Sequence, residues 1–313
     1  MKIHVISHCE VSKDHLLRLK KLGDVRVSDM LKLSDPEFVK SRVDADILMV
    51  LPRPKLDFVP YLKKCKFISI MSTGIDGINT ALAHKNGIKM SSVPEYATES
   101  VAEHIFSLML VLARNIKKAD EVIRKNKWDD GLIVESFELF ELKNKTLGIF
   151  GFGKIGMRVS EIAKSFEMNV VAHTKNVKNP MPDIDYVSFE KLLSDSNFIV
   201  LSAPLTSDTF HKFGENEFKK MKKKPFIINT ARGAIIDEKA LIKALKNKWV
   251  RGAGLDVFEK ERVKNNPFVK FENVVLTPHV AFGSKEALDK MIDVSTDNIE
   301  AFLKGTPKNI VNF

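Results

Sequence analysis

Three glycines, Gly151, Gly153 and Gly156, constrain the fold of this chain more than any other feature of its sequence. They form a G-x-G-x-x-G pattern directly after the apolar run TLGIF and directly before the helical pattern KIGMRVSEIAKSF. The first glycine permits a tight turn, the second lets backbone approach a pyrophosphate, and the third lets the helix pack on the strand. The start of the helix offers further N–H groups to phosphate. The pattern therefore predicts a parallel sheet that binds a dinucleotide.

Short apolar runs alternate with helical patterns on both sides of this turn, which is the rhythm of parallel strands connected by helices. At 313 residues the chain is long for one core, so we expect two domains. Two βα series are joined by a strong helix over Ser100–Ile116, and a last helix covers Ser284–Lys304. The predicted strands are Lys2–Ser7, Ala45–Leu51, Lys66–Met71, Thr146–Phe150, Asn169–Ala172, Phe198–Leu201, Phe226–Asn229, Gly252–Val257 and Val274–Leu276.

The net charge of the chain indicates which kind of partner it binds. The chain carries a net charge of +10, which favours anionic partners. The densest basic cluster lies within 219–224. Its basic residues are all lysines and no aromatic residues interleave with them, so it does not resemble a nucleic-acid site. Small anionic substrates fit this charge, and we expect no nucleic-acid partner.

The cysteines and apolar runs indicate the compartment. Only two cysteines, Cys9 and Cys65, are present, which excludes a disulfide scaffold and suits a reducing cytosol. No apolar run approaches the ~20 residues that span a bilayer, and the start of the chain does not read as a signal peptide. His4, His8, Cys9 and Glu10 lack the spacing of metal ligands. We therefore expect a cytoplasmic protein with no membrane partner and no metal.

The end of the second strand after the glycines bears on the choice of dinucleotide. An acidic residue at this point usually binds the ribose hydroxyls of NAD, about 20 residues after the glycines. The segment NVVAHTK instead offers Thr174 and Lys175, which would accept a 2′-phosphate that a carboxylate repels. The sequence therefore favours NADP over NAD.

Three later segments place reactive side chains after successive strands, where ligands gather in open α/β sheets. Arg232 lies in INTARGAIID, Asp256 and Glu261 lie in GLDVFEKER, and His279 lies in VVLTPHVAFGS. An arginine can hold a carboxylate with two parallel hydrogen bonds, and a histidine can exchange a proton near neutral pH. A carboxylate beside this histidine would fix its tautomer.

With these motifs the chain resembles the D-isomer-specific 2-hydroxyacid dehydrogenases over nearly its whole length. The resemblance rests on STGIDGIN, VAEHIFSLMLVLAR, LKNKTLGIFGFGKIG, LSAPLT, INTARGAIID, GLDVFEKE and NVVLTPHVAFGS. It implies two Rossmann-like doubly wound parallel-sheet domains with a cleft between them. The substrate domain would be discontinuous, comprising 1–98 and 284–313, and the dinucleotide-binding domain would comprise 99–283. The long helix after residue 100 would build a homodimer interface.

The resemblance also implies roles for individual residues. His279 would exchange the proton with the carbonyl oxygen of a small 2-keto acid, Glu261 would keep His279 oriented and charged, and Arg232 would bind the substrate carboxylate. The positions implied for the substrate are Thr73, Gly74, Ile75, Arg232 and Arg53. Those implied for the cofactor, beside Thr174 and Lys175, are Thr73, Gly151, Gly153, Lys154, Ile155, Gly156, Ala203, Pro204, Thr230, Ala231 and Asp256.

The sequence departs from the family pattern at three points. The acidic residue that binds ribose is missing, Ser202 replaces a common histidine, and Arg262 replaces a proline after Glu261. Hydroxypyruvate and glyoxylate are the leading substrates. Phosphoglycerate or phosphite dehydrogenases stay open as alternatives, whereas a formate dehydrogenase would carry Gln in place of Glu261. A dinucleotide-sensing corepressor would be a non-enzymatic alternative.

Overall fold

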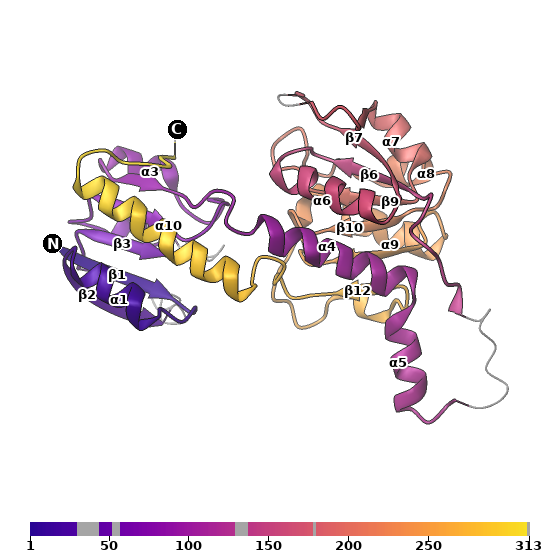
Figure 1. Cartoon of the computed structure of the whole chain (residues 1–313), viewed down its shortest axis with the longest axis horizontal. Helices are drawn as coiled ribbons and strands as arrows, with labels where there is room; N and C mark the ends of the chain where they lie inside the picture. Colours follow the sequence, from indigo (N-terminus) through magenta and orange to yellow (C-terminus); the bar gives the residue numbers. More distant parts are fainter. Residues whose placement is uncertain (30–43, 52–56, 129–136, 178–179, 312–313) are drawn as a thin grey trace. The chain divides into compact units, whose positions relative to one another are not determined.

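The structure is a computed structural model that describes residues 1–29, 44–51, 57–128, 137–177 and 180–311. The chain divides into two compact units, of which the first comprises Met1–Ala97 and Ser284–Phe313 and the second Thr98–Gly283 (Figure 1). Each unit contains one sheet in which every strand pair is parallel. The predicted α/β class with two doubly wound parallel sheets is therefore confirmed.

The first unit contains a five-stranded sheet in the order β2-β1-β3-β4-β5. Because β2 pairs on one side of β1 and β3 on the other, the direction of winding reverses at β1. The strands are β1 Lys2–Ser7, β2 Asp24–Asp29, β3 Ile47–Val50, β4 Phe67–Ile70 and β5 Lys89–Ser91. The helices are α1 Lys13–Lys20, α3 Thr80–Lys85 and α10 Lys285–Leu303, with the 3-10 turn η2 Val59–Tyr61.

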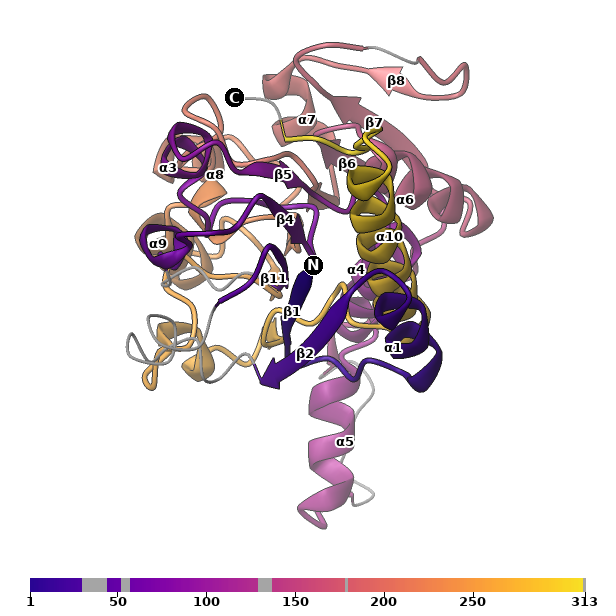
Figure 2. The same cartoon turned by 90° about the vertical axis from the view of Figure 1, so that its left-hand side faces the viewer.

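Helix α10 returns from the end of the chain to the sheet of the first unit, where it lies beside α1 (Figures 1 and 2). The Ser69 hydroxyl on β4 donates a hydrogen bond to the Ser295 carbonyl over 3.0 Å. The rings of Phe67 and Phe302 stack with centroids 4.4 Å apart. These contacts make the last helix part of the first unit's core.

The second unit contains a seven-stranded sheet in the order β12-β11-β10-β9-β6-β7-β8. The chain runs outward from β6 through β8 and then returns to the other side of β6 as β9, so a topological switch point lies between β6 and β9. The strands are β6 Thr146–Phe150, β7 Asn169–His173, β8 Asp185–Tyr186, β9 Phe198–Leu201, β10 Phe226–Asn229, β11 Gly252–Leu255 and β12 Val274–Leu276. The helices are α4 Thr98–Ala113, α5 Ile116–Arg124, α6 Lys154–Ser165, α7 Phe189–Asp195, α8 Glu215–Lys219 and α9 Glu238–Lys246, with the 3-10 turns η4 Gly233–Ile235 and η5 Pro267–Lys270.

Helix α4 packs inside the second unit, which explains why its sequence is broadly apolar. One side lies against α6, and another lies against β10, β11 and β12. Leu108 comes so close to β11 that a Cβ atom added to Gly254 would stand 3.0 Å from the Leu108 Cβ. Within the described part of the chain, no helix combines the length and apolar character needed to cross a bilayer.

Candidate active site

The loops that carry most predicted site residues leave one edge of the second unit's sheet. Because all seven strands are parallel, their carboxyl ends share this edge, and open α/β sheets bind ligands there at the switch point. After β6, β7, β9, β10, β11 and β12 these loops, with the first residues of α6 and η4, comprise residues 151–156, 174–175, 202–206, 230–233, 256–262 and 277–281.

The three glycines after β6 serve different purposes. Gly151 has a φ of +90°, and a Cβ atom there would stand 2.5 Å from the Ala203 nitrogen. A Cβ at Gly156 would stand 2.8 Å from the Gly151 carbonyl oxygen, whereas a Cβ at Gly153 would meet nothing within 4 Å. The protein's own packing thus requires Gly151 and Gly156 but not Gly153. Gly153 is also the N-cap of α6 and has no side-chain cap, so the turn fits a pyrophosphate that approaches the helix N-terminus.

The loops after β6 and β9 contact each other at the switch point. The Ser202 hydroxyl donates a hydrogen bond to the Gly151 carbonyl, and Ala203 is buried beneath the glycine turn. Pro204 is exposed beside it. On the first turn of α6, Lys154 is exposed and Ile155 is half-buried. The hydroxyl of Ser202 therefore joins the two loops.

The end of β7 brings Lys175 to a carboxylate. Lys175 Nζ lies 2.7 Å from Asp208 Oδ2, and both side chains are exposed. The hydrogen bond with Asp208 raises the pKa of Lys175 and lowers that of Asp208. Thr174 precedes Lys175 and is half-buried. The ammonium that the sequence assigns to a 2′-phosphate therefore already has an anionic partner in the chain.

His279 and Glu261 form a hydrogen-bonded pair. His279 Nδ1 lies 2.7 Å from Glu261 Oε1, although the residues stand 18 positions apart on the loops after β12 and β11. A carboxylate at Nδ1 fixes the tautomer with the proton on that nitrogen, which leaves Nε2 as the atom for proton exchange. The His279 backbone has a φ of +58°, in the left-handed region that non-glycine residues seldom occupy.

The buried carboxylate of Asp256 holds the turn that carries His279. Its oxygens accept hydrogen bonds from the Val280 and Ala281 amides at 2.9 and 3.0 Å and from the Thr277 hydroxyl at 2.6 Å. Its carbonyl accepts a hydrogen bond from the His279 amide at 2.8 Å. The side chain is fully buried, so in this conformation its oxygens accept hydrogen bonds from the protein and are not accessible to a nicotinamide.

Arg232 is presented by a turn that Asn229 stabilises. The buried Asn229 side chain accepts from the Ala231 amide at 3.1 Å and donates to the Arg232 carbonyl at 3.0 Å. The Arg232 guanidinium donates to the Ala231 carbonyl at 2.8 Å, and Thr230 is half-buried between strand and turn. Asn229 is absent from the predicted site residues. The sequence feature that could have revealed it is a polar residue at the end of the otherwise apolar strand FIIN.

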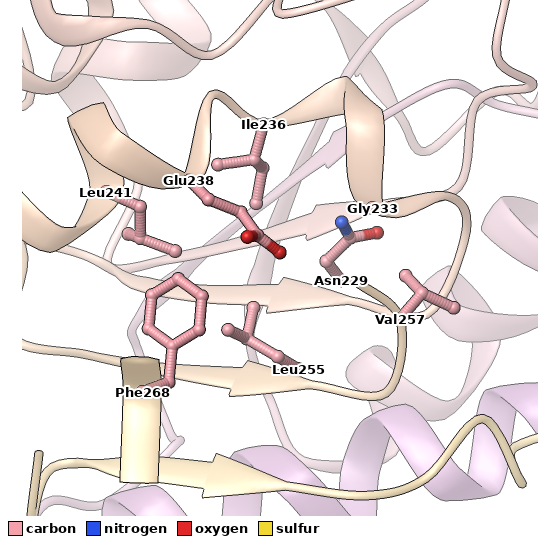
Figure 3. A pocket seen from close by; sticks show the side chains of 8 residues that line it. All are labelled: Asn229, Gly233, Ile236, Glu238, Leu241, Leu255, Val257 and Phe268. Carbon is pink, nitrogen blue, oxygen red and sulfur yellow. The ribbon is translucent and has the colours of Figure 1, made fainter. Parts of the chain in front are cut away.

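The Arg232 turn is tied to the segment that leads to Glu261. A Cβ at Gly233 would stand 1.9 Å from the Phe258 carbonyl carbon, so only glycine lets the two backbones come so close. Glu238 and Glu259 each accept the other's backbone N–H at 2.9 Å. Burial raises the pKa of Glu238. Figure 3 shows its carboxylate in a small pocket over Leu255.

The remaining predicted site residues belong to the first unit. The Thr73 hydroxyl donates to the Val93 carbonyl over 2.8 Å, and the carbonyls of Gly74 and Ile75 accept bonds from within the same loop after β4. Arg53 lies outside the described residues. Within the second unit, the structure joins His279 to Glu261, Asp256 to the His279 turn, and Arg232 to Ala231.

Comparison with known families assigns most of the second unit. The model for the NAD-binding domain of D-isomer-specific 2-hydroxyacid dehydrogenases matches residues 106–281. This range contains the glycine turn and all three predicted catalytic residues.

Individual relatives match almost the whole chain. A glyoxylate reductase of Thermococcus litoralis is 40% identical over 277 residues, which cover 86% of this chain and 84% of the relative. A hydroxypyruvate reductase of Blautia hydrogenotrophica is 33% identical over 305 residues, covering 94% of each. Among solved structures, an acyclic imino acid reductase in complex with NADPH and D-Arg superposes with a TM-score of 0.89 at 32% identity, covering 100% of both chains.

Proposed function

Because the chain belongs to the family of D-isomer-specific 2-hydroxyacid dehydrogenases, which are oxidoreductases, we propose that it reduces a small 2-keto acid to the D-2-hydroxy acid with NAD(P)H. The observation that carries the proposal is the 2.7 Å contact between His279 Nδ1 and Glu261 Oε1 at the carboxyl edge of a dinucleotide-binding sheet. Glyoxylate and hydroxypyruvate are the first substrates to test, since relatives are named for reducing them.

The proposed reaction needs one hydride and one proton. A dinucleotide held at the glycine turn would supply the hydride for C2 of the keto acid. His279 donates a hydrogen bond from Nδ1–H to Glu261. Its Nε2 would give a proton to the carbonyl oxygen as the hydroxyl forms. Glu261 stabilises the imidazolium before that transfer. In the oxidative direction Nε2 would accept the proton instead.

The substrate carboxylate would be held by charge and by backbone N–H groups. Arg232 can bind it with two parallel hydrogen bonds, and this also places positive charge near the polarised carbonyl. The amides of Thr73, Gly74 and Ile75 are proposed as further donors. The net charge of +10 fits a small anionic substrate.

For the cofactor we propose NADP in preference to NAD. The glycine turn would bind the pyrophosphate, and the loops after β9 and β10 would border the nicotinamide half. Thr174 and Lys175 would bind the 2′-phosphate, for which Lys175 would exchange its present partner Asp208. The remaining proposed contacts are Lys154, Ile155, Ala203, Pro204, Thr230, Ala231, Thr73 and the backbone of Asp256.

We also propose a homodimer that works in the cytoplasm. The interface would include the helix after residue 100 and the following helix α5, which exposes Ile116 and Ile123. Both cysteines are free, as a reducing compartment favours, and burial raises the pKa of Cys65 to about 11, which keeps its thiol unreactive.

The alternatives make different demands on Glu261. Hydride loss from formate requires no proton transfer, so an ionisable pair of carboxylate and imidazole would have no task there. A sensor that binds dinucleotide without turnover would keep the glycine turn but show no reaction.

The test is oxidation of NADPH or NADH, followed by nicotinamide absorbance, with glyoxylate, hydroxypyruvate and pyruvate offered separately. Turnover that needs a keto acid, with a D-configured product, supports the proposal. Tight dinucleotide binding without turnover of any keto acid would favour the sensor and contradict the proposed reductase activity.

A further inference from the structure

Two polar side chains on one face of α4 hold both ends of the turn that carries His279. The Ser100 hydroxyl donates to the Ala281 carbonyl at 2.7 Å, and His104 Nε2 lies 3.0 Å from the Thr277 hydroxyl oxygen. Positions 100 and 104 are four residues apart and therefore share a helix face. Leu108, four residues further on, packs against Gly254 of β11. This face of α4 is thus fixed against the sheet directly beneath the His279 turn.

The protons in this network have one consistent arrangement. The Thr277 hydroxyl has a single proton and donates it in a hydrogen bond of 2.6 Å to Asp256 Oδ1. The Thr277 oxygen must then accept a hydrogen bond from its other neighbour. His104 Nε2 is therefore the donor in its contact with Thr277, whether the ring is neutral or charged. His104 Nε2 also lies 3.7 Å from Asp256 Oδ1, on the side of the negative charge.

Asp256 links the Thr277 hydroxyl to the backbone of the turn that carries His279. Its carboxylate accepts the amides of Val280 and Ala281, and its carbonyl accepts the amide of His279. The left-handed backbone of His279 costs free energy that its surroundings must offset. The network from α4 supplies bonds on both sides of that residue, before it through Thr277 and after it through Ala281.

We propose that Ser100 and His104 are positioning residues for His279, which act through Thr277 and Asp256 and do not touch the substrate. Their function is to hold the His279 ring where Nδ1 meets Glu261. The inference rests on the proposed role of His279 in proton transfer. Under this proposal, a helix whose sequence is otherwise typical of a buried core element helps to position an active-site residue.

The test compares His104→Leu and Ser100→Ala with two matched variants. His104→Gln places an amide N–H the same number of bonds from Cβ as the histidine Nε2, so it can still donate to Thr277. Ser107→Ala removes a hydroxyl from α4 that, among the described residues, donates to the Glu103 carbonyl of the same helix. Three properties are measured: kcat for keto-acid reduction, the Kd for NADPH by fluorescence, and the ¹⁵N NMR signal of His279 Nδ1 in the protein without cofactor.

The expected result is a fall in kcat of about tenfold for His104→Leu and about fivefold for Ser100→Ala, as the loss of one hydrogen bond implies. The Kd for NADPH should stay the same, and the Nδ1 signal should move toward that of an imidazole without a carboxylate partner. His104→Gln should restore most of kcat and the signal, and Ser107→Ala should match the wild type.

Two outcomes would overturn the inference: an unchanged Nδ1 signal in His104→Leu, or equal losses in His104→Leu and His104→Gln, which would mean that ring packing alone matters. The NMR signal needs neither substrate nor turnover. If the wild-type protein reduced no keto acid, a displaced signal would still support the network, while the proposed function would fail.

Discussion

His279 and Glu261 meet through a hydrogen bond of 2.7 Å between Nδ1 and Oε1, and each stands on a loop that a separate set of bonds holds in place. Asp256 fixes the turn before and after His279. The reciprocal bonds between Glu238 and Glu259 fix the segment before Glu261. The protein's own hydrogen bonds therefore hold the pair in place, and a proton-transfer site requires such preorganisation.

Glu261→Gln should lower kcat for keto-acid reduction by about a hundredfold. The carboxamide oxygen can still accept a hydrogen bond from Nδ1–H but carries no charge, so it stabilises positive charge on the ring less well. Initial rates of keto-acid reduction measure the loss, with Glu272→Gln, an exposed carboxylate elsewhere, as the control. An unchanged kcat in Glu261→Gln would contradict the role of Glu261.

Gly153→Ala and Gly151→Ala should separate ligand binding from folding. A Cβ at Gly153 would meet no atom of the described residues within 4 Å, so Gly153→Ala should keep the wild-type Tm while it weakens dinucleotide binding by about tenfold or more. A Cβ at Gly151 would collide with Ala203 at a φ of +90°, so Gly151→Ala should lower Tm. Thermal unfolding and NADPH titration measure both properties. Equal dinucleotide affinity in Gly153→Ala and wild type would show that the pyrophosphate binds elsewhere.

Lys175→Ala should change the preference between the two dinucleotides. Loss of the ammonium should weaken NADPH binding by about tenfold and leave NADH binding unchanged, since only NADPH carries the 2′-phosphate. Asp208→Asn should strengthen NADPH binding, because the carboxylate competes for Lys175 over 2.7 Å. Titrations with both dinucleotides make the comparison. If Lys175→Ala weakened both equally, its role at the 2′-phosphate would be wrong.

The sequence predicts the interior of both sheets better than their edges. The interior strands β1, β6, β9 and β10 have the predicted bounds, since apolar runs buried on both faces mark the interior strands of parallel sheets. Of the edge strands, β12 also has the predicted bounds. The strands β2, β5 and β8 were not predicted, and all three lie at an edge of their sheet. The segment DVRVSD of β2 is largely exposed, so no apolar run marks it.

The reactive residues of the site could be predicted because their motifs are local, whereas their supports could not. The bonds from Ser100 to Ala281 and from His104 to Thr277 join residues 181 and 173 positions apart. No spacing rule reveals such pairs, because the winding order of the sheet brings them together. Within VAEHIFSLMLVLAR, His104 is a polar residue in an apolar helix, and this is the one local sign of its role.

His4 should make the stability of the protein depend on pH. Burial beside Arg26 lowers the pKa of His4 from 6.5 to about 4, and its Nε2 contacts the Ser28 hydroxyl at 2.9 Å. The unfolded chain therefore binds a proton between these values that the folded chain does not. The stability from neutral His4 is complete above pH 6.5 and is lost as pH falls through about 4, a loss of about 3 kcal/mol. His4→Gln keeps a partner for Ser28 without titrating. Urea unfolding at several pH values should show wild type losing stability relative to His4→Gln only in the acidic range, and a constant difference would place a protonated imidazole in the folded protein.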